Sequence, residues 1–340
     1  MSIGTLRGAT VLVTGGAGFI GSHLVDALVD GGARVRVLDS FVTGTRDNLA
    51  GTLGRLELLE GDVRDPEVCA RACADVEVVF HQAALGSVPL SLARPGNSLD
   101  VNVSGTARVL EAARDAGVRR VVYASSSSVY GDSETLPKRE GEEGDPLSPY
   151  ALSKWADEEV ARVFSRCFGL ELVGLRYFNV YGPRQDPAGP YAAVIPRFFQ
   201  ARLAGEAPVI FGDGLQSRDF TFVGDAVAAN LAAARAPSAG GGRAYNVARG
   251  RRTSLLELER LIRELTGGGG PDPVFRDPRP GDVRHSVAAT EAAAEALGFE
   301  ARVDLREGLA ASREYYGVSG AGASLTSQPS SVSGDRSTGS

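Results

Sequence analysis

Lysine is nearly missing from this sequence: of its 36 lysines and arginines, only Lys138 and Lys154 are lysines. Lysine is ordinarily among the commoner residues, and the heavy use of glycine (43 residues) indicates biased genome composition as the general cause. Such a bias removes lysines that arginine can replace, so the two that persist are of interest. We predict that Lys138, within TLPKREGEEGD, is a solvated surface charge.

Cysteine and histidine are also scarce, which excludes two kinds of site. The three cysteines, Cys69, Cys73 and Cys167, fit neither a disulfide framework nor a zinc site in number and spacing. The three histidines, His23, His81 and His285, lie far apart in the sequence. We therefore predict reduced thiols, no metal site and a cytoplasmic location.

Long hydrophobic runs and an excess of positive charge are absent as well. No apolar run approaches the roughly 18 residues of a membrane helix, and the N-terminal MSIGTLRGAT lacks the regions of a signal peptide. The net charge of −6 gives no global basic field for nucleic acid. We expect neither a membrane nor a nucleic-acid partner, and 340 residues suffice for one large domain or two moderate ones.

Short apolar runs and helical periodicity alternate through the first half of the chain. The apolar runs occupy 10–14, 34–38, 56–59, 76–80, 120–124 and 170–175, and the helical patterns occupy 19–30, 65–74, 98–116 and 149–168. This alternation predicts an α/β fold with a Rossmann-type, doubly wound parallel sheet covered on both faces. We assign residues 1–180 to this domain, with its core beginning near residue 8.

Proline and glycine become frequent after residue 180, where longer loops separate short strands and helices. We predict a smaller C-terminal α/β substrate lobe over 181–318, beside the carboxyl edge of the sheet, with some of this chain returning to the first domain. Residues 319–340 contain eight serines and four glycines and few apolar side chains, which predicts a disordered tail.

A glycine-rich turn, TGGAGFIG, joins the first predicted strand to the first predicted helix. Gly15 permits a sharp turn, Gly18 lets a pyrophosphate approach the backbone, and Gly21 allows close helix packing; the helix N-terminus attracts anions. Asp39, at the end of the second strand, can accept hydrogen bonds from ribose hydroxyls and repels a 2′-phosphate. The pattern predicts a dinucleotide site that favours NAD over NADP.

A second motif supplies chemistry. Tyr150 and Lys154 form Y-x-x-x-K in the predicted helix 149–168, a spacing that puts both side chains on one helical face. The ammonium group favours a phenolate, which is a general base for a hydroxyl proton. Ser126, in the serine run 125–128, can share the substrate oxygen. We predict that these three residues are catalytic.

These motifs resemble the extended branch of the short-chain dehydrogenase/reductase family, the NAD-dependent sugar-nucleotide epimerases and dehydratases, over residues 8–316. Dehydratases of this branch carry T-D-E where this chain has Ser126, Ser127 and Ser128, and the serine form resembles a 4-epimerase. Bacterial UDP-N-acetylglucosamine 4-epimerases are most similar, through HQAALGSVPLS, ASSSSVYGD, LSPYALSK, LRYFNVYGPRQDP, YAAVIPRF, FGDGLQSRDF and RPGDVRHS. The resemblance implies a homodimer.

The same resemblance implies the residues of both binding sites. NAD would be held by Gly15, Gly18, Phe19, Ile20, Gly21, Asp39, Gly44, Asp62, Val63, Gln82, Ala83, Ala84, Asn102, Tyr150, Lys154 and Phe178. A UDP-sugar would be held by Ser87, Ser128, Tyr150, Asn179, Ala193, Val194, Val209, Phe211, Arg218, Arg279, Asp282 and Ser286. Within this set, Arg218 and Arg279 would grip the diphosphate.

The size of residue 286 bears on the substrate, because galactose-specific relatives carry a tyrosine at the position of Ser286. The serine leaves room for an N-acetyl group, which predicts interconversion of UDP-N-acetylglucosamine (UDP-GlcNAc) and UDP-N-acetylgalactosamine (UDP-GalNAc), with UDP-glucose and UDP-galactose as a second candidate pair. Three alternatives stay open: a 4-epimerase of UDP-glucuronic or UDP-N-acetylglucosaminuronic acid with Arg184 at the carboxylate, a net dehydrogenase, and a non-catalytic NAD sensor.

Overall fold

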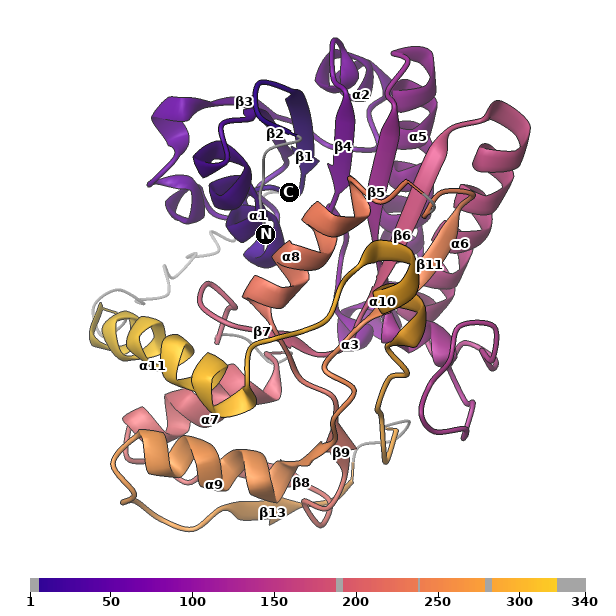
Figure 1. Ribbon diagram of the computed structural model, residues 1–340. Helices are drawn as coiled ribbons and strands as arrows, with labels where there is room; N and C mark the ends of the chain where they lie inside the picture. Colours follow the sequence, from indigo (N-terminus) through magenta and orange to yellow (C-terminus); the bar gives the residue numbers. More distant parts are fainter. Residues whose placement is uncertain (1–5, 188–191, 238, 279–282, 323–340) are drawn as a thin grey trace, which may run out of the picture.

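The larger lobe is built on a seven-stranded sheet of order β11-β6-β5-β4-β1-β2-β3 (Figure 1). The computed structural model describes residues 6–187, 192–237, 239–278 and 283–322. The strands are β1 (Thr10–Thr14), β2 (Arg34–Asp39), β3 (Leu56–Glu60), β4 (Val78–His81), β5 (Arg120–Ser126), β6 (Glu171–Tyr177) and β11 (Arg243–Val247). Every pairing in this sheet is parallel, so the carboxyl ends share one edge, and the predicted Rossmann-type sheet is confirmed.

Helices cover both faces of this sheet. One face packs against α1 (Phe19–Asp30), α8 (Val223–Ala233) and α10 (Glu291–Leu297), and the other against α2 (Pro66–Cys73), α5 (Gly105–Asp115) and α6 (Pro149–Phe168). Within β1, Val11 and Val13 belong to the first core and Leu12 to the second, and all three are fully buried. A strand buried on both sides needs consecutive apolar residues, which explains the run TVLVT.

The smaller lobe lies beyond the carboxyl edge of the sheet (Figure 1). Its core lies among α7 (Val194–Leu203), α9 (Leu255–Leu265) and α11 (Leu305–Gly322). Short strands pair as β7 (Val180–Tyr181) with β10 (Thr221–Phe222), β8 (Val209–Phe211) with β13 (Val274–Arg276), and β9 (Ser217–Arg218) with β12 (Thr253–Ser254). Between these segments, α8 and β11 return to the larger lobe, where β11 pairs with β6.

Several local boundaries differ from the predicted ones. β5 continues to Ser126, and α3 (Val88–Ala93), capped by the hydroxyl of Ser87, was not predicted. The predicted helix 98–116 consists of α4 (Pro95–Leu99), a π-helical turn (Asp100–Ser104) and α5. Short 3₁₀ turns occupy Arg46–Leu49, Leu53–Arg55 and Ser127–Tyr130.

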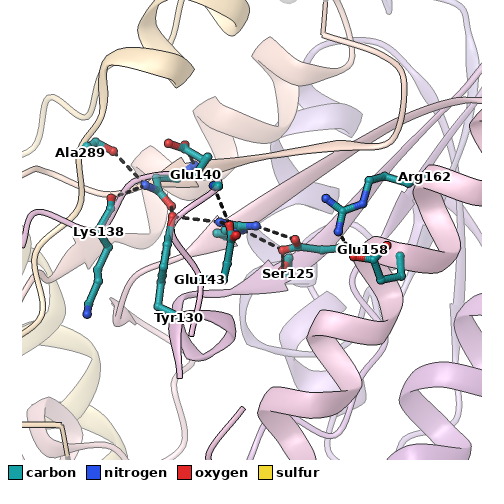
Figure 2. Close-up of polar contacts among 12 residues, drawn as sticks. Ser125, Tyr130, Lys138, Glu140, Glu143, Glu158, Arg162 and Ala289 are labelled. Carbon is teal, nitrogen blue, oxygen red and sulfur yellow. Dashed lines mark hydrogen bonds and ion pairs between the residues drawn. The ribbon is translucent and has the colours of Figure 1, made fainter. Parts of the chain in front are cut away.

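Lys138 is buried, so its prediction as a solvated surface charge is wrong. The residue is 4% exposed, and its backbone bridges to Ala288. Its carbonyl accepts from Asn246 Nδ2 at 2.9 Å, and its Nζ donates to the carbonyl of Ser133. Figure 2 shows Lys138 beside Ala289. Burial lowers the pKa of Lys138; the pairing with a distant segment excludes water from a loop that is charged in sequence.

Two further expectations concern what the described part of the chain contains. None of its helices is both long enough and apolar enough to cross a membrane, and it holds no group of three or more residues suited to a metal ion. The segment predicted as a tail begins within α11, which ends at Gly322. Residues 323–340, Arg279 and Asp282 lie outside the described residues.

Candidate active site

A cleft of about 500 Å³ lies where the carboxyl ends of the strands meet, at the switch of strand order between β1 and β4. Ligands of doubly wound sheets bind in this position. Its lining includes Ser126 and most residues predicted to hold NAD: Gly15, Gly18, Phe19, Ile20, Gly21, Asp39, Asp62, Val63, Gln82, Ala83, Ala84, Tyr150 and Lys154. Strand ends and the segments that directly follow them supply most of these residues because parallel strands end at one edge, whereas Tyr150 and Lys154 come from α6 (Pro149–Phe168).

The glycine turn after β1 fits a diphosphate. Gly15 has φ +65°, and a Cβ on Gly21 would collide with the carbonyl oxygen of Gly15, so both positions need glycine. The N-cap of α1 is Gly18, which gives no side-chain cap, and the first turn of α1 has no acidic residue. The free N–H groups and the positive end of the helix dipole therefore face the cleft.

Asp39 holds the glycine turn in place as well as lining the cleft. Its Oδ2 accepts from the backbone N–H of Ala17 at 2.9 Å, and its Oδ1 accepts from Phe41 N at 2.8 Å. Burial raises the pKa of Asp39, while these two hydrogen bonds act in the opposite direction. Each carboxylate oxygen keeps a second lone pair, so the ribose contact predicted from the sequence fits this geometry.

Gly44, Asn102 and Phe178 are not among the described residues that line the cleft, although all three were predicted at the NAD site. Gly44 packs against the backbone of Ala17, where a Cβ would lie 2.8 Å from the carbonyl carbon. Asn102 is fully buried and accepts from Leu85 N at 2.8 Å. Phe178 is fully buried in an apolar cluster. These residues support the walls from behind.

Ser126 and Tyr150 both line the cleft, from β5 and from the first turn of α6. Ser126 Oγ accepts from Ser128 N at 3.2 Å and so caps the 3₁₀ turn. Tyr150 N donates to Ser91 Oγ at 3.1 Å, which attaches the start of α6 to α3. The side chain of Ser148 caps α6 by accepting from a backbone N–H. Local capping thus orients two of the predicted catalytic residues.

Lys154 is buried at the base of the cleft. Its Nζ donates to the carbonyl of Ala124 at 3.0 Å and to Asp157 Oδ2 at 3.0 Å. Burial by itself lowers a lysine pKa, but the Asp157 carboxylate and the neighbouring Tyr150 outweigh it and raise the pKa of Lys154. Lys154 therefore carries its charge within the protein, as the predicted mechanism requires.

A buried ionic network supports the catalytic helix from behind (Figure 2). Glu158 of α6 accepts from Arg176 of β6 through Nε at 2.9 Å and Nη2 at 2.7 Å, and from Ser125 Oγ at 2.5 Å. Arg176 Nη1 also donates to Tyr130 OH at 3.0 Å and pairs with Glu143. The side chains of Arg176 and Glu158 are 4% and 2% exposed. The network joins α6 to β5 and β6.

A second pocket, of about 180 Å³, opens from the smaller lobe. Its lining includes five residues predicted for the UDP-sugar: Asn179, Val194, Val209, Phe211 and Arg218. Asn179 lines both this pocket and the larger cleft. Arg197 and Gln216 also line the second pocket, and neither was predicted. The two spaces therefore adjoin at Asn179.

Four other described residues predicted for the substrate do not line either space: Ser87, Ser128, Ala193 and Ser286. Ser87 caps α3, Ala193 is the N-cap of α7, and Ser286 N donates to Ser217 O at 3.1 Å. Ser128 Oγ is buried and has no hydrogen-bond partner among the described residues. A buried hydroxyl without a partner is costly, but Ser128 lines neither space, so its predicted ligand contact stays a prediction.

Comparison with known proteins decides the family. Residues 11–248 match the model of the NAD dependent epimerase/dehydratase family. The chain belongs to this family. Its NAD dependence and the family resemblance seen in the sequence are both confirmed.

Individual proteins that are similar to this chain also belong among the sugar-nucleotide epimerases. The UDP-glucose 4-epimerase of Mycolicibacterium smegmatis is 42% identical over 90% of this chain and 97% of its own. The structure of the Thermotoga maritima UDP-glucose 4-epimerase with UDP-glucose is 38% identical, with a TM-score of 0.86 over 91% of this chain and 99% of its own. A UDP-N-acetylglucosamine 4-epimerase from Methanobrevibacter ruminantium is also 38% identical, with a TM-score of 0.87 over 91% and 98%.

Several polar residues of the family member's site were not predicted from its sequence. Tyr177 lines the cleft, and its OH donates to Gln82 Oε1 at 3.1 Å and accepts from Asn230 Nδ2 at 2.7 Å. This bridge connects the NAD site to α8. The helical spacing of Asp157 and Glu158 from Tyr150 (i+7 and i+8) was the available signal for the two buried acids.

We expect His81 to make the stability of the fold depend on pH. It is buried, with Nδ1 2.7 Å from Thr14 Oγ1 and Nε2 3.0 Å from Thr106 Oγ1. Because Thr106 donates its proton to Asn102 O at 2.5 Å, Nε2 donates to Thr106 and Nδ1 accepts from Thr14. Burial, followed by the nearby charge of Lys154, lowers the pKa of His81 to about 3.

We expect the free energy of unfolding to fall as the pH decreases below 6.5, the ordinary histidine value. Unfolded His81 binds a proton that the native side chain refuses, which contributes a slope of up to ~1.4 kcal/mol per pH unit. Urea unfolding from pH 6.5 to about 5, where most carboxylates stay ionised, measures this slope. In His81→Gln the dependence becomes shallower; an unchanged dependence would contradict the assignment.

Proposed function

We propose that this protein is a UDP-sugar 4-epimerase whose substrate pair is UDP-GlcNAc and UDP-GalNAc, with UDP-glucose and UDP-galactose as a second pair. The observation that carries this proposal is the cleft shared by Ser126, Tyr150 and Lys154. Residues 126–128, the last residue of β5 and the two that follow it, are serines, where the resemblance would require an acid pair for a dehydratase. The named relatives support 4-epimerase chemistry.

The reaction follows from the side chains around the cleft. Tyr150 takes the proton from O4 of the sugar, Ser126 hydrogen-bonds that oxygen, and the Lys154 ammonium stabilises the phenolate. NAD, when bound, supplies a hydride acceptor and donor for C4. After the keto sugar has turned its other face to the cleft, Tyr150 returns the proton and the configuration at C4 is inverted. Enclosure by the two lobes keeps water from the keto sugar.

The second pocket supports binding of the UDP part. Arg197 and Arg218 line it, and guanidinium groups bind phosphates with two parallel hydrogen bonds. The N-terminus of α7 has no side-chain cap, and its first residue, Val194, lines the same pocket. Asn179, at the junction with the cleft, would contact the sugar. With UDP in the second pocket, the sugar would extend past Asn179 into the cleft that Tyr150 lines.

Arg184 does not support the uronic-acid alternative. Its Nη2 pairs with Asp26 Oδ2 of α1 at 2.7 Å, and Arg184 is not among the described residues that line either space. The carbonyl of Pro183, the residue before Arg184, accepts a hydrogen bond from His23 Nε2 of α1 at 2.9 Å. The loop is thus docked on α1, and Nη1 of Arg184 is buried without a hydrogen-bond partner among the described residues. The neutral sugars are favoured because Arg184 lines neither space.

The test is NMR of the purified NAD-bound protein with UDP-GlcNAc, UDP-glucose and UDP-glucuronic acid. We expect conversion of UDP-GlcNAc to UDP-GalNAc, and the variant Ser286→Tyr tests the size argument. The tyrosine should abolish turnover of the acetylated sugar by filling the space of its acetyl group while sparing UDP-galactose. Equal loss with both sugars would refute the role of Ser286, and conversion of UDP-glucuronic acid alone would refute the proposed substrates.

Pairing of two copies through the helical segments 98–116 and 149–168 stays a prediction from the resemblance, and the cytoplasmic location stays a prediction from the cysteine content. Leu152, Trp155 and Val163, on one face of α6, are 42%, 39% and 42% exposed. Their spacing of three and eight residues repeats with the helical period, so they form one apolar stripe. This stripe supports a homodimer.

A further inference from the structure

Asp157 is a buried carboxylate in contact with the catalytic lysine. Tyr150, Lys154 and Asp157 occupy positions i, i+4 and i+7 of α6 and therefore share one face of the helix. Asp157 Oδ2 lies 3.0 Å from Lys154 Nζ, and the two side chains are 1% and 3% exposed. The ammonium thus has the predicted base on one side along the helix and a carboxylate on the other.

The surroundings of this pair contain few other titratable groups. From α6, Tyr150 and Glu158 act on Lys154; from β4, His81 faces Lys154 and is neutral; from β5, Tyr123 faces Asp157 and is fully buried. Glu158 is neutralised by Arg176, as described above. From α5, the hydroxyl of Thr106 faces Asp157. Asp157 is therefore the principal counter-charge of Lys154.

The charge of Asp157 has two opposing consequences. A buried ammonium without a counter-ion loses its proton readily, so Asp157 keeps Lys154 charged. The same carboxylate cancels part of the field that the ammonium exerts on Tyr150, because charges interact strongly where water is excluded. The first effect extends activity to higher pH, and the second limits phenolate formation at lower pH.

We propose that Asp157 is a positioning residue that sets the pH range of the reaction, by holding the Lys154 ammonium against β5 and moderating its action on Tyr150. This inference rests on the roles of Tyr150 and Lys154 in the proposed function. Asp157 touches neither sugar nor cofactor in this scheme; it acts through the lysine.

The test is Asp157→Asn, which keeps the shape and removes the charge. We expect both limbs of the pH profile of kcat to move to lower pH, each by about one unit, the size of effect that a neighbouring charge exerts. The acidic limb moves because the ammonium acts on Tyr150 without compensation, and the basic limb moves because Lys154 deprotonates sooner. Asp157→Glu should restore the profile.

A second measurement is independent of the sugar substrate. Ultraviolet difference spectra over a pH series report phenolate formation, and subtraction of the Tyr150→Phe spectra isolates Tyr150. We expect its signal to appear about one pH unit lower in Asp157→Asn. If the protein had no epimerase activity, the proposed function would fail, but this titration would still test Asp157. Should Asp157→Asn not fold, the smaller uncharged Asp157→Ser serves both measurements.

The matched control is Glu159→Gln, two residues along α6. Glu159 pairs with Arg162 at the surface, with side chains 42% and 48% exposed, so removal of its charge should leave both profiles in place. Superimposable profiles for Asp157→Asn and the unsubstituted protein would overturn the proposal. A uniform loss of kcat at every pH, without movement of either limb, would also overturn it, since this outcome indicates structural support alone.

Discussion

Replacement of Tyr150 by phenylalanine should lower kcat by about 10²-fold or more, the usual loss when a general base is removed. The phenyl ring fills the same space in the cleft but has no oxygen to take the O4 proton. Initial rates of UDP-GlcNAc conversion at saturating substrate measure the effect. KM should change little, because the contacts proposed for UDP lie in the second pocket.

The fold of Tyr150→Phe should be intact, which separates chemistry from structure. Tyr150 anchors the start of α6 through its backbone N–H to Ser91 Oγ, and this contact persists in the variant. Retention of NAD during purification, measured after release from the denatured protein, is the control. Turnover near the normal rate would show that another group moves the proton.

The variant Glu158→Ala should lower the free energy of unfolding by about 3–5 kcal/mol, since it leaves the Arg176 guanidinium buried without its main counter-ion. Glu158 accepts three hydrogen bonds, two from Arg176 and one from Ser125. Loss of these hydrogen bonds also frees α6 from β5 and β6. Tyr150 and Lys154 on α6 then lose their alignment with Ser126 on β5. Urea unfolding at neutral pH measures the change.

Two comparisons isolate the buried pair. Glu159→Ala removes a neighbouring acid of α6 that pairs with Arg162 at the surface, and exposed pairs contribute at most about 1 kcal/mol. The double variant Glu158→Leu with Arg176→Met removes both charges and should recover much of the lost stability. A cost for Glu158→Ala as small as that for Glu159→Ala would contradict the burial argument.

Local patterns predicted the parts of the site that one segment builds. The glycine turn, Asp39 and the pair Tyr150–Lys154 could be assigned because a turn, a strand end and a helical period each depend on a few adjacent residues. Parallel strands then place their carboxyl ends at one edge, which brought Ser126 to the same cleft. The substrate pocket needed the resemblance as well, and Arg197 was missed because no local pattern marks it.

Contacts between distant segments could not be predicted in this way. Asp157, Glu158 and Glu159 are three consecutive acidic residues. Asp157 and Glu158 are buried, whereas Glu159 lies at the surface. Asn102 and Phe178 lie behind the cleft because the π-helical turn and the chain after β6 direct them to the interior. Such outcomes depend on which segments pack together, and neighbouring residues carry little information about that.

The two lysines separate what the sequence alone determined from what the tertiary structure decided. Lys154 was assigned from its spacing to Tyr150, because an α-helix fixes which side chains share a face. Lys138 lies among charged residues that predict exposure, but pairing with the chain around Ala288 buries it. Local periodicity follows from backbone geometry, whereas exclusion of water from a side chain depends on segments far away in the sequence.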